Sequence, residues 1–264
     1  MPTTLKKQIL FCLSHPRSLS TAFYRAMIER PDVSVLYEPF TIQFWVSRIG
    51  YIGFESDDRP DCCEMKTPSC VAQYVEKKAL NKRLFLKDSA MATRQYLLAK
   101  HSDAFIQKTA FTFLLRHPAK VIASFYRQYN DAHVTTIAAD YTNLLSIFNR
   151  IEIVTGNKPL LIDTDDLQRS PEKIMQAYCD YNQLPFSGSS LHWKSNHMDD
   201  RLRVCQSWHA NTVASAGFKP LQDNHIEKAL DEIKKTPVSK QLLSLYERQL
   251  PVYETLLSRK IITV

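Results

Sequence analysis

Residues 9–21 read Ile-Leu-Phe-Cys-Leu-Ser-His-Pro-Arg-Ser-Leu-Ser-Thr. The first five residues form a continuous apolar run, which is typical of a strand buried on both faces of a parallel sheet. A turn rich in hydroxyl side chains follows, and apolar residues then recur at helical spacing from Ala22 to Met27. A strand, a polar turn and a helix in that order predict an α/β fold with an anion site where the helix begins.

Three later apolar runs repeat the strand pattern, at residues 84–86, 111–115 and 160–162. Apolar residues at helical spacing occupy residues 121–129 and 144–151. Strands that alternate with helices are typical of βαβ crossovers. We therefore expect a parallel sheet flanked by helices.

The C-terminal region is also predicted to be helical. Asp223 and Asn224 can cap a helix that Pro237 ends, and the helical pattern resumes at Leu242.

The size and composition of the chain favour one large domain. It has 264 residues, of which 44% are hydrophobic, so we expect a single domain over residues 1–264. Two stretches, residues 41–68 and 187–219, are the candidate loops that cover a site and shape it for a substrate. The apolar run at 9–13 is too short for a signal peptide, and no stretch approaches the roughly 20 apolar residues of a membrane span. We therefore expect a cytoplasmic protein.

The charge and the cysteines narrow the classes of partner. A net charge of +7 favours anionic partners, which leaves open nucleic acid, a membrane surface and a phosphorylated small molecule. There is no long Lys/Arg block, so we expect no nucleic acid partner. The six cysteines contain no C-x-x-C pair, so a disulfide framework is not expected.

The turn at residues 14–21 is the first chemical motif. Backbone N–H groups at a helix start attract an anion, Ser18, Ser20 and Thr21 add hydroxyl donors, and Arg17 adds charge. The turn lacks the glycine and lysine of a G-x-x-x-x-G-K-[ST] loop, which argues against a nucleoside triphosphatase. A helix that is simply capped by serine is the alternative.

A second motif follows the strand at 111–115. Pro118 suits the first position of a helix, so Arg116 leaves the strand beside a helix N-terminus. Ser124, on the second turn of that helix, can face the same anion. This predicts a second phosphate site, and a surface ion pair of Arg116 is the alternative.

Together the two motifs resemble the signatures by which the sulfotransferase superfamily binds 3′-phosphoadenosine 5′-phosphosulfate (PAPS). Residues 116–129 are similar to the 3′-phosphate signature of the cytosolic sulfotransferases, and residues 16–31 look more like the tyrosylprotein sulfotransferases. Glu38 and Lys87 match the catalytic glutamate and the Lys-Asp pair of the latter. The rest of the chain resembles bacterial sulfotransferase-like proteins. The resemblance implies a sulfotransferase fold, with a parallel sheet of the P-loop type.

The resemblance also implies roles for the residues. Arg17 and Lys87 would neutralise charge on the leaving phosphate, and Glu38 would take the proton from an acceptor hydroxyl. No metal is implied, and the acceptor and the oligomeric state stay open. The residues implied to bind PAPS are Arg17, Ser18, Leu19, Ser20 and Thr21 for the 5′-phosphate, with Arg116 and Ser124 for the 3′-phosphate.

Two positions and one missing signature depart from the family pattern. Leu19 stands where better-known relatives carry glycine, and Ser89 stands where cytosolic enzymes carry their catalytic histidine. The C-terminal Arg-Lys-Gly signature is missing, and Arg201 or Arg203 is the candidate replacement.

Two other functions remain as alternatives. A metal-dependent nucleotide phosphotransferase would use Asp163, at the end of an apolar strand, with Asp165 and Asp166. A nucleotide-binding interaction protein without turnover would need neither Glu38 nor Lys87. Glu38 as a helix cap or a partner of a surface lysine, and Lys87 as a solvated lysine, are the structural alternatives.

Overall fold

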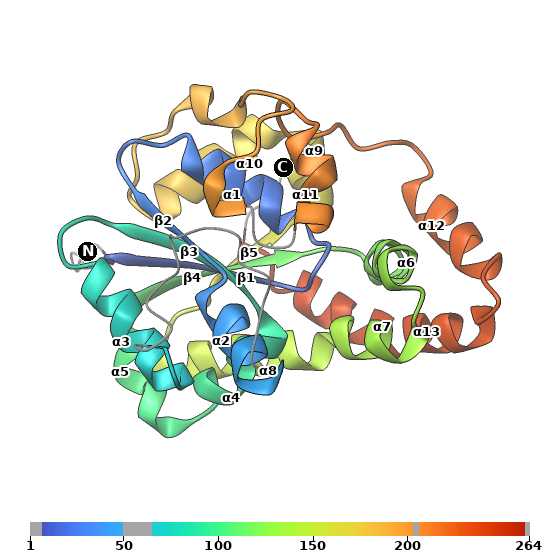
Figure 1. The fold of residues 1–264 in the computed structure, drawn as a ribbon, viewed down its shortest axis with the longest axis horizontal. Helices are drawn as coiled ribbons and strands as arrows, with labels where there is room; N and C mark the ends of the chain where they lie inside the picture. Colours follow the sequence, from blue (N-terminus) through green and yellow to red (C-terminus); the bar gives the residue numbers. More distant parts are fainter. Residues whose placement is uncertain (1–6, 50–64, 203–205, 262–264) are drawn as a thin grey trace.

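The computed structural model describes residues 7–49, 65–202 and 206–261, and within them a parallel sheet pairs five strands in the order β2-β3-β1-β4-β5 (Figure 1). The strands are β1 (Ile9–Ser14), β2 (Ser34–Tyr37), β3 (Leu84–Ser89), β4 (Thr109–Leu115) and β5 (Leu160–Asp163). The α-helices are α1 (Ser20–Ile28), α2 (Pro39–Ile49), α3 (Pro68–Lys78), α4 (Ala90–Leu97), α5 (Asp103–Lys108), α6 (Pro118–Tyr129), α7 (Ala132–Ala138), α8 (Tyr141–Thr155), α9 (Thr164–Arg169), α10 (Pro171–Tyr181), α11 (Gln206–Val213), α12 (His225–Lys234) and α13 (Ser239–Leu257). Short 3-10 helices occupy η1 (Lys100–Ser102), η2 (Gly188–Leu191) and η3 (Asp200–Leu202).

The four predicted strands are confirmed as β1, β3, β4 and β5. Every residue of β1 and β3 is buried, and the apolar runs at 9–13 and 84–86 suit a sheet covered on both faces. Strand β2, for which no bounds were predicted, ends at Tyr37, directly before Glu38. Because all the strands are parallel, β1, β2, β3 and β4 end at the same edge of the sheet.

Helices cover both faces of the sheet, and alternate strand residues pack against them. Leu10 and Cys12 of β1 share one core with Phe23 of α1 and Tyr178 of α10. Phe11 and its neighbours on the other face pack against α2, α4 and α8. Figure 1 shows α1 and α10 on one side of the sheet and α2, α4 and α8 on the other.

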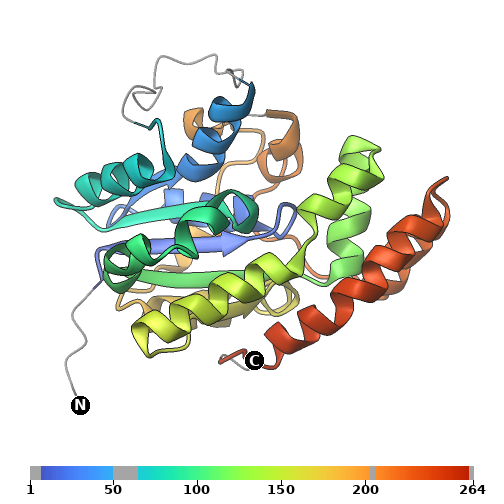
Figure 2. The ribbon, with the colours of Figure 1, turned by 90° about the horizontal axis from the view of Figure 1, so that it is seen from below.

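The C-terminal helices α12 and α13 pack against each other and against α6. The predicted break at Pro237 is confirmed, because α12 ends at Lys234 and α13 begins at Ser239. Figure 2 shows α13 running past α7 and α8, and it also contacts α6. The predicted cap by Asn224 is wrong in one respect. Its backbone is left-handed, with a φ of 54°, and its side chain makes no capping hydrogen bond.

The two predicted covering loops contain regular structure. Residues 41–49 lie in α2, and helix α11 lies within residues 187–219. Residues 50–64, together with Arg203, fall outside the described part of the chain, and so does the side chain of Arg201. In the described part, no helix is both long and apolar enough to span a membrane.

Candidate active site

A cleft of about 880 Å³ opens at the carboxyl ends of β1 to β4. Open α/β sheets bind ligands at this edge. The cleft brings together every residue predicted for the site: Arg17, Ser18, Leu19, Ser20, Thr21, Glu38, Lys87, Arg116 and Ser124.

The turn between β1 and α1 has an unusual backbone. Arg17 and Leu19 both adopt left-handed conformations, with φ values of 67° and 56°. Such a conformation costs a residue with a side chain roughly 1–2 kcal/mol, so the surrounding structure must hold it. Ser18 is fully buried between them, and its Oγ has no hydrogen-bond partner in the described structure.

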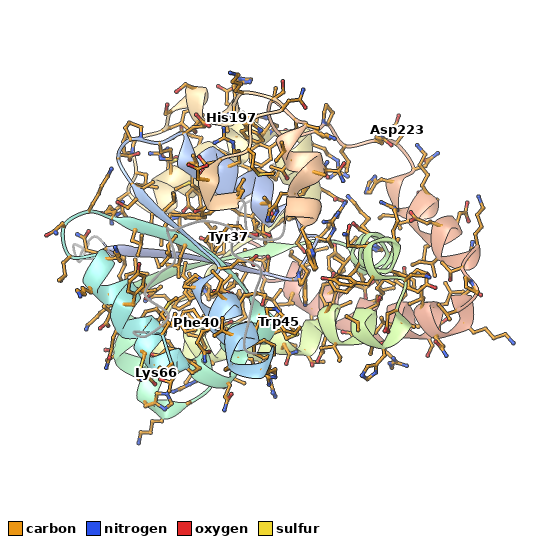
Figure 3. All side chains as sticks on the ribbon, in the orientation of Figure 1. Tyr37, Phe40, Trp45, Lys66, His197 and Asp223 are labelled. Atoms are coloured by element: carbon orange, nitrogen blue, oxygen red, sulfur yellow. The ribbon has the colours of Figure 1, made fainter. Side chains whose placement is uncertain are left out.

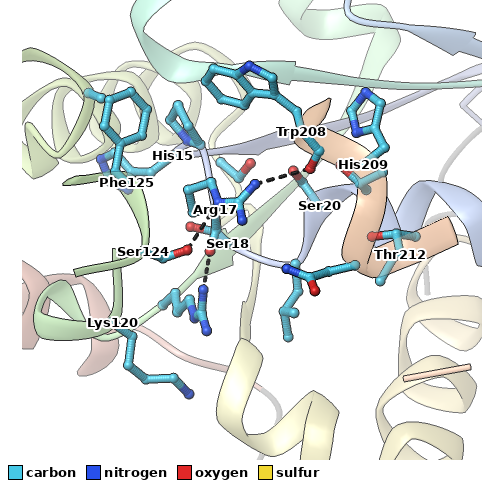
Figure 4. Close-up of a pocket in the computed structure, with 18 of the residues that line it drawn as sticks. His15, Arg17, Ser18, Ser20, Lys120, Ser124, Phe125, Trp208, His209 and Thr212 are labelled. Atoms are coloured by element: carbon cyan, nitrogen blue, oxygen red, sulfur yellow. Dashed lines mark hydrogen bonds between the residues drawn. The ribbon is translucent and has the colours of Figure 1, made fainter. Parts of the chain in front are cut away.

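Arg17 joins the two predicted phosphate motifs (Figure 4). Its Nε donates to Ser124 Oγ at 3.1 Å, and its Nη1 donates to the carbonyl of Trp208 at 3.1 Å. Arg116 in turn donates from Nη1 to the carbonyl of Arg17. Burial lowers the pKa of Arg116 to about 10, and its Nε is buried with no partner in the described structure. Arg116 thus lies inside the cleft, and the alternative of a surface position is wrong.

Glu38 and Lys87 meet where β2 and β3 end. Lys87 Nζ lies 2.5 Å from Glu38 Oε1 and 4.4 Å from the centre of the Tyr37 ring. Lys87 is only 3% exposed, so the alternative of a solvated lysine is wrong. Glu38 does pair with a lysine, but this lysine is buried and lines the same cleft. The positive φ of Glu38, 42°, turns the chain from β2 into α2.

Asp88 anchors the start of α2 beside this pair, a role that the sequence analysis missed. Its carboxylate accepts hydrogen bonds from the N–H of Phe40 at 2.7 Å and from Oγ1 of Thr41 at 2.5 Å. Burial, and then the charge of Glu38, raises the pKa of Asp88 to about 7. The signal was present in the sequence, because Asp88 directly follows Lys87 at the end of a buried strand.

The sequence matches the family described as Sulfotransferase domain over residues 8–248. The chain belongs to the sulfotransferase family. This confirms the family that the two motifs predicted.

Two curated relatives from Arabidopsis thaliana are each 26% identical to this chain. They are branched-chain-amino-acid aminotransferase-like protein 2, aligned over 225 residues, and branched-chain-amino-acid aminotransferase-like protein 1, aligned over 253 residues. The alignments cover 81% and 95% of this chain, but 37% and 42% of the relatives. The chain thus spans about two fifths of the length of the curated relatives it matches.

Two solved structures share the fold of this chain. The sulfotransferase domain from the Synechococcus PCC 7002 olefin synthase superimposes with a TM-score of 0.58 at 18% identity, covering 94% of this chain and 96% of that one. The sulfotransferase domain from the curacin biosynthetic pathway gives a TM-score of 0.53 at 16% identity, covering 92% and 97%. The predicted α/β sulfotransferase fold is confirmed.

Two histidines beside the two motifs pack against neighbouring parts of the chain. His15 Nε2 donates to the carbonyl of Asp140 at 3.1 Å, and its ring lies 4.0 Å from that of Tyr141. His117 packs against the ring of Tyr253. Burial lowers the pKa of each histidine to about 4, so both are neutral at pH 7.

The aspartates at the end of β5 already have partners. Asp163 caps α9 by accepting from the Asp165 N–H at 2.9 Å. Asp165 binds Lys120 Nζ at 2.5 Å and His225 Nε2 at 2.8 Å. Among the described residues, no group of three or more histidines, cysteines or acidic residues is arranged to hold a metal ion. These contacts favour a structural role for the strand-end aspartates.

An aromatic cluster that was not predicted from the sequence also lines the cleft. The rings of Phe125 and Tyr129 stack at 4.7 Å, and Trp208 meets Tyr129 at 5.0 Å. Phe125 and Tyr129 are neighbours on α6, but Trp208 comes from α11. The spacing on α6 was visible in the sequence, whereas the contact with Trp208 depends on how α11 packs.

Proposed function

We propose that this sulfotransferase takes a sulfuryl group from PAPS and transfers it to an acceptor hydroxyl by in-line displacement. The observation that carries the proposal is the hydrogen bond between Arg17 and Ser124, which joins the two segments that resemble PAPS-binding signatures. Arg116 reinforces the junction by donating to the Arg17 carbonyl. One cleft therefore offers charged and hydroxyl donors to both phosphate ends of a single molecule.

The start of α1 is the proposed site of the 5′-phosphate. The buried hydroxyl of Ser18 has no hydrogen-bond partner in the described structure, so it can donate a hydrogen bond to a phosphate oxygen. The first turn of α1 adds backbone N–H groups that have no partner inside the helix, at Ser20 and Thr21. The Arg17 guanidinium adds a positive charge at the same turn.

Arg116 and Ser124 are the proposed ligands of the 3′-phosphate. The lowered pKa of Arg116, about 10, still leaves the guanidinium charged at pH 7. A buried guanidinium with an unpartnered Nε gains strongly from a phosphate oxygen. Because ATP has no 3′-phosphate, this end of the cleft would distinguish PAPS from ATP.

Glu38 and Lys87 are the proposed catalytic residues at the acceptor end. As the acceptor oxygen bonds to sulfur, the bond from sulfur to the bridging oxygen breaks, and its electron pair stays with the leaving 5′-phosphate. The acceptor proton passes to the Glu38 carboxylate. Arg17 and Lys87 stabilise the charge that grows on the leaving phosphate. The products are a sulfate ester and 3′-phosphoadenosine 5′-phosphate (PAP).

Calorimetric titration with PAP, ATP and AMP tests the donor site. We expect PAP to bind more tightly than ATP or AMP. Arg116→Ala should weaken the binding of PAP by about tenfold to a hundredfold. Arg94→Ala, which removes an exposed arginine from α4, is the matched control and should change nothing. No binding of PAP, or tighter binding of ATP with magnesium, would overturn the proposal in favour of a phosphotransferase.

A further inference from the structure

The acceptor end of the cleft has an apolar wall. Ile42 and Trp45 of α2 line it, together with Met91 of α4. The helices that carry them begin directly after Glu38 and shortly after Lys87. Trp45 is 39% exposed although most large apolar side chains of the described chain are buried. A half-exposed tryptophan inside a cavity is typical of a surface that a ligand covers.

Helical spacing aligns this wall with Glu38. The N–H of Ile42 donates to the Glu38 carbonyl at 2.9 Å, so Glu38 occupies the cap position of α2. Glu38, Thr41, Ile42 and Trp45 then follow at i, i+3, i+4 and i+7, which places them on one face of the helix. Trp45 lies two turns, or about 10 Å, along the axis from Glu38.

Helix α7 supplies further apolar side chains to the cleft. Val134 and Ile137 line it, with exposures of 36% and 46%. Helix α7 lies on the same side of the sheet as α2 and α4 (Figure 1). Figure 3 places Phe40 and Trp45 on opposite sides of α2. Apolar side chains of α2, α4 and α7 therefore line the same cleft as Glu38.

This part of the cleft offers little to a polar acceptor. Among its described lining residues on α2, α4 and α7, the one hydroxyl is that of Thr41, and it already donates to Asp88 at 2.5 Å. A sugar would lose water from several hydroxyls without gaining partners, at a cost for each. An acidic peptide would need cations, and none stands among these lining residues of α2, α4 and α7.

We propose that the acceptor is an apolar alcohol whose hydroxyl meets Glu38 and whose carbon body lies along α2 against Trp45. The inference rests on the proposed function, because it assumes that Glu38 takes the proton of the acceptor. Alkyl and aryl alcohols share the chemistry that the wall recognises.

The test is calorimetric titration of acceptors into the protein saturated with PAP. The probes are 1-octanol, 2-naphthol, glucose and a short acidic peptide with one tyrosine. We expect at least one of the two alcohols to bind about tenfold or more tightly than glucose and the peptide. Trp45→Ala should weaken the binding of that alcohol about tenfold, and Ile137→Ser should have the same effect. Ile153→Ala removes an apolar side chain that is 76% exposed outside the cleft, and it should leave the affinity unchanged.

The outcomes separate the two proposals. If PAP itself fails to bind, the proposed function fails. If PAP binds but glucose or the peptide binds more tightly than both alcohols, the acceptor inference alone is overturned. It is also overturned if neither alcohol binds, or if Trp45→Ala and Ile137→Ser both keep the affinity of the parent protein. Tighter binding of 2-naphthol identifies an aryl acceptor, and tighter binding of 1-octanol an alkyl one.

Discussion

Nζ of Lys87 lies 2.5 Å from Oε1 of Glu38, where β3 and β2 end side by side. The backbone repeats this contact, because the Glu38 N–H donates to the Lys87 carbonyl at 3.0 Å. Glu38 keeps a left-handed backbone that only a fixed environment sustains. The two side chains are therefore held in one arrangement before any ligand enters.

Replacing Glu38 by glutamine tests its role as the general base. Glutamine keeps the shape of the side chain but cannot accept the proton of the acceptor. We expect kcat to fall roughly a hundredfold to ten-thousandfold, while PAP affinity stays within about twofold. Steady-state kinetics and calorimetry give the two values. Glu76→Gln, which alters a carboxylate paired with the exposed Lys108, is the control, and an unchanged kcat in Glu38→Gln would exclude the base role.

Ser124→Ala tests the junction between the two motifs. The change removes the acceptor of the Arg17 Nε hydrogen bond and a hydroxyl proposed to bind the 3′-phosphate. We expect PAP to bind about threefold to tenfold more weakly, with AMP affected less because it lacks that phosphate. Ser146→Ala, whose hydroxyl bonds to a carbonyl within α8, is the matched control. Equal losses for PAP and AMP would speak against a 3′-phosphate role.

The sequence allows these residues to be grouped at one edge of the sheet because the motifs stand at or near strand ends. Arg17 follows β1, Lys87 lies two residues before the end of β3 and Arg116 follows β4, and these strands are neighbours in the sheet. Parallel strands bring their carboxyl ends to one edge, so the apolar runs together with the family resemblance place residues that lie far apart in the chain in one cleft.

Contacts made by the helices after β5 could not be predicted in the same way. Residues 206–213 read Gln-Ser-Trp-His-Ala-Asn-Thr-Val, which has no continuous apolar face, and yet they form α11. The contact of Trp208 with Tyr129 depends on tertiary packing, as does that of His225 with Asp165. Such pairs leave no periodic signal in the sequence.

The left-handed backbone of Leu19 makes a stability prediction. Leu19→Gly removes a backbone cost of about 1–2 kcal/mol but adds about 0.5–1 kcal/mol of chain entropy in the unfolded state. We expect its free energy of unfolding to lie between that of the parent and about 1.5 kcal/mol above it. Leu19→Val should be less stable than the parent because β-branched residues fit this conformation worst. Urea titrations measure both. Leu80 is exposed and its backbone is outside the left-handed region, so it is the control position. There the glycine variant should have no higher free energy of unfolding than the valine variant. If the glycine and valine variants rank in the same order of stability at both positions, backbone strain at Leu19 is unimportant.

The buried His15 predicts loss of stability in acid. Burial lowers its pKa from 6.5 to about 4, so between these values the unfolded chain binds a proton that the folded chain does not. Stability from this group is therefore complete above pH 6.5 and falls as the pH drops toward 4, by roughly 2 kcal/mol at pH 5. His15→Gln keeps a donor for the Asp140 carbonyl but cannot titrate, so its free energy of unfolding should change less between pH 7 and pH 5. His133→Gln, which alters an exposed histidine, should keep the pH dependence of the parent. If His15→Gln also keeps the pH dependence of the parent, His15 takes up its proton equally in the folded and unfolded states. The buried contact with Asp140 is then not what limits stability in acid.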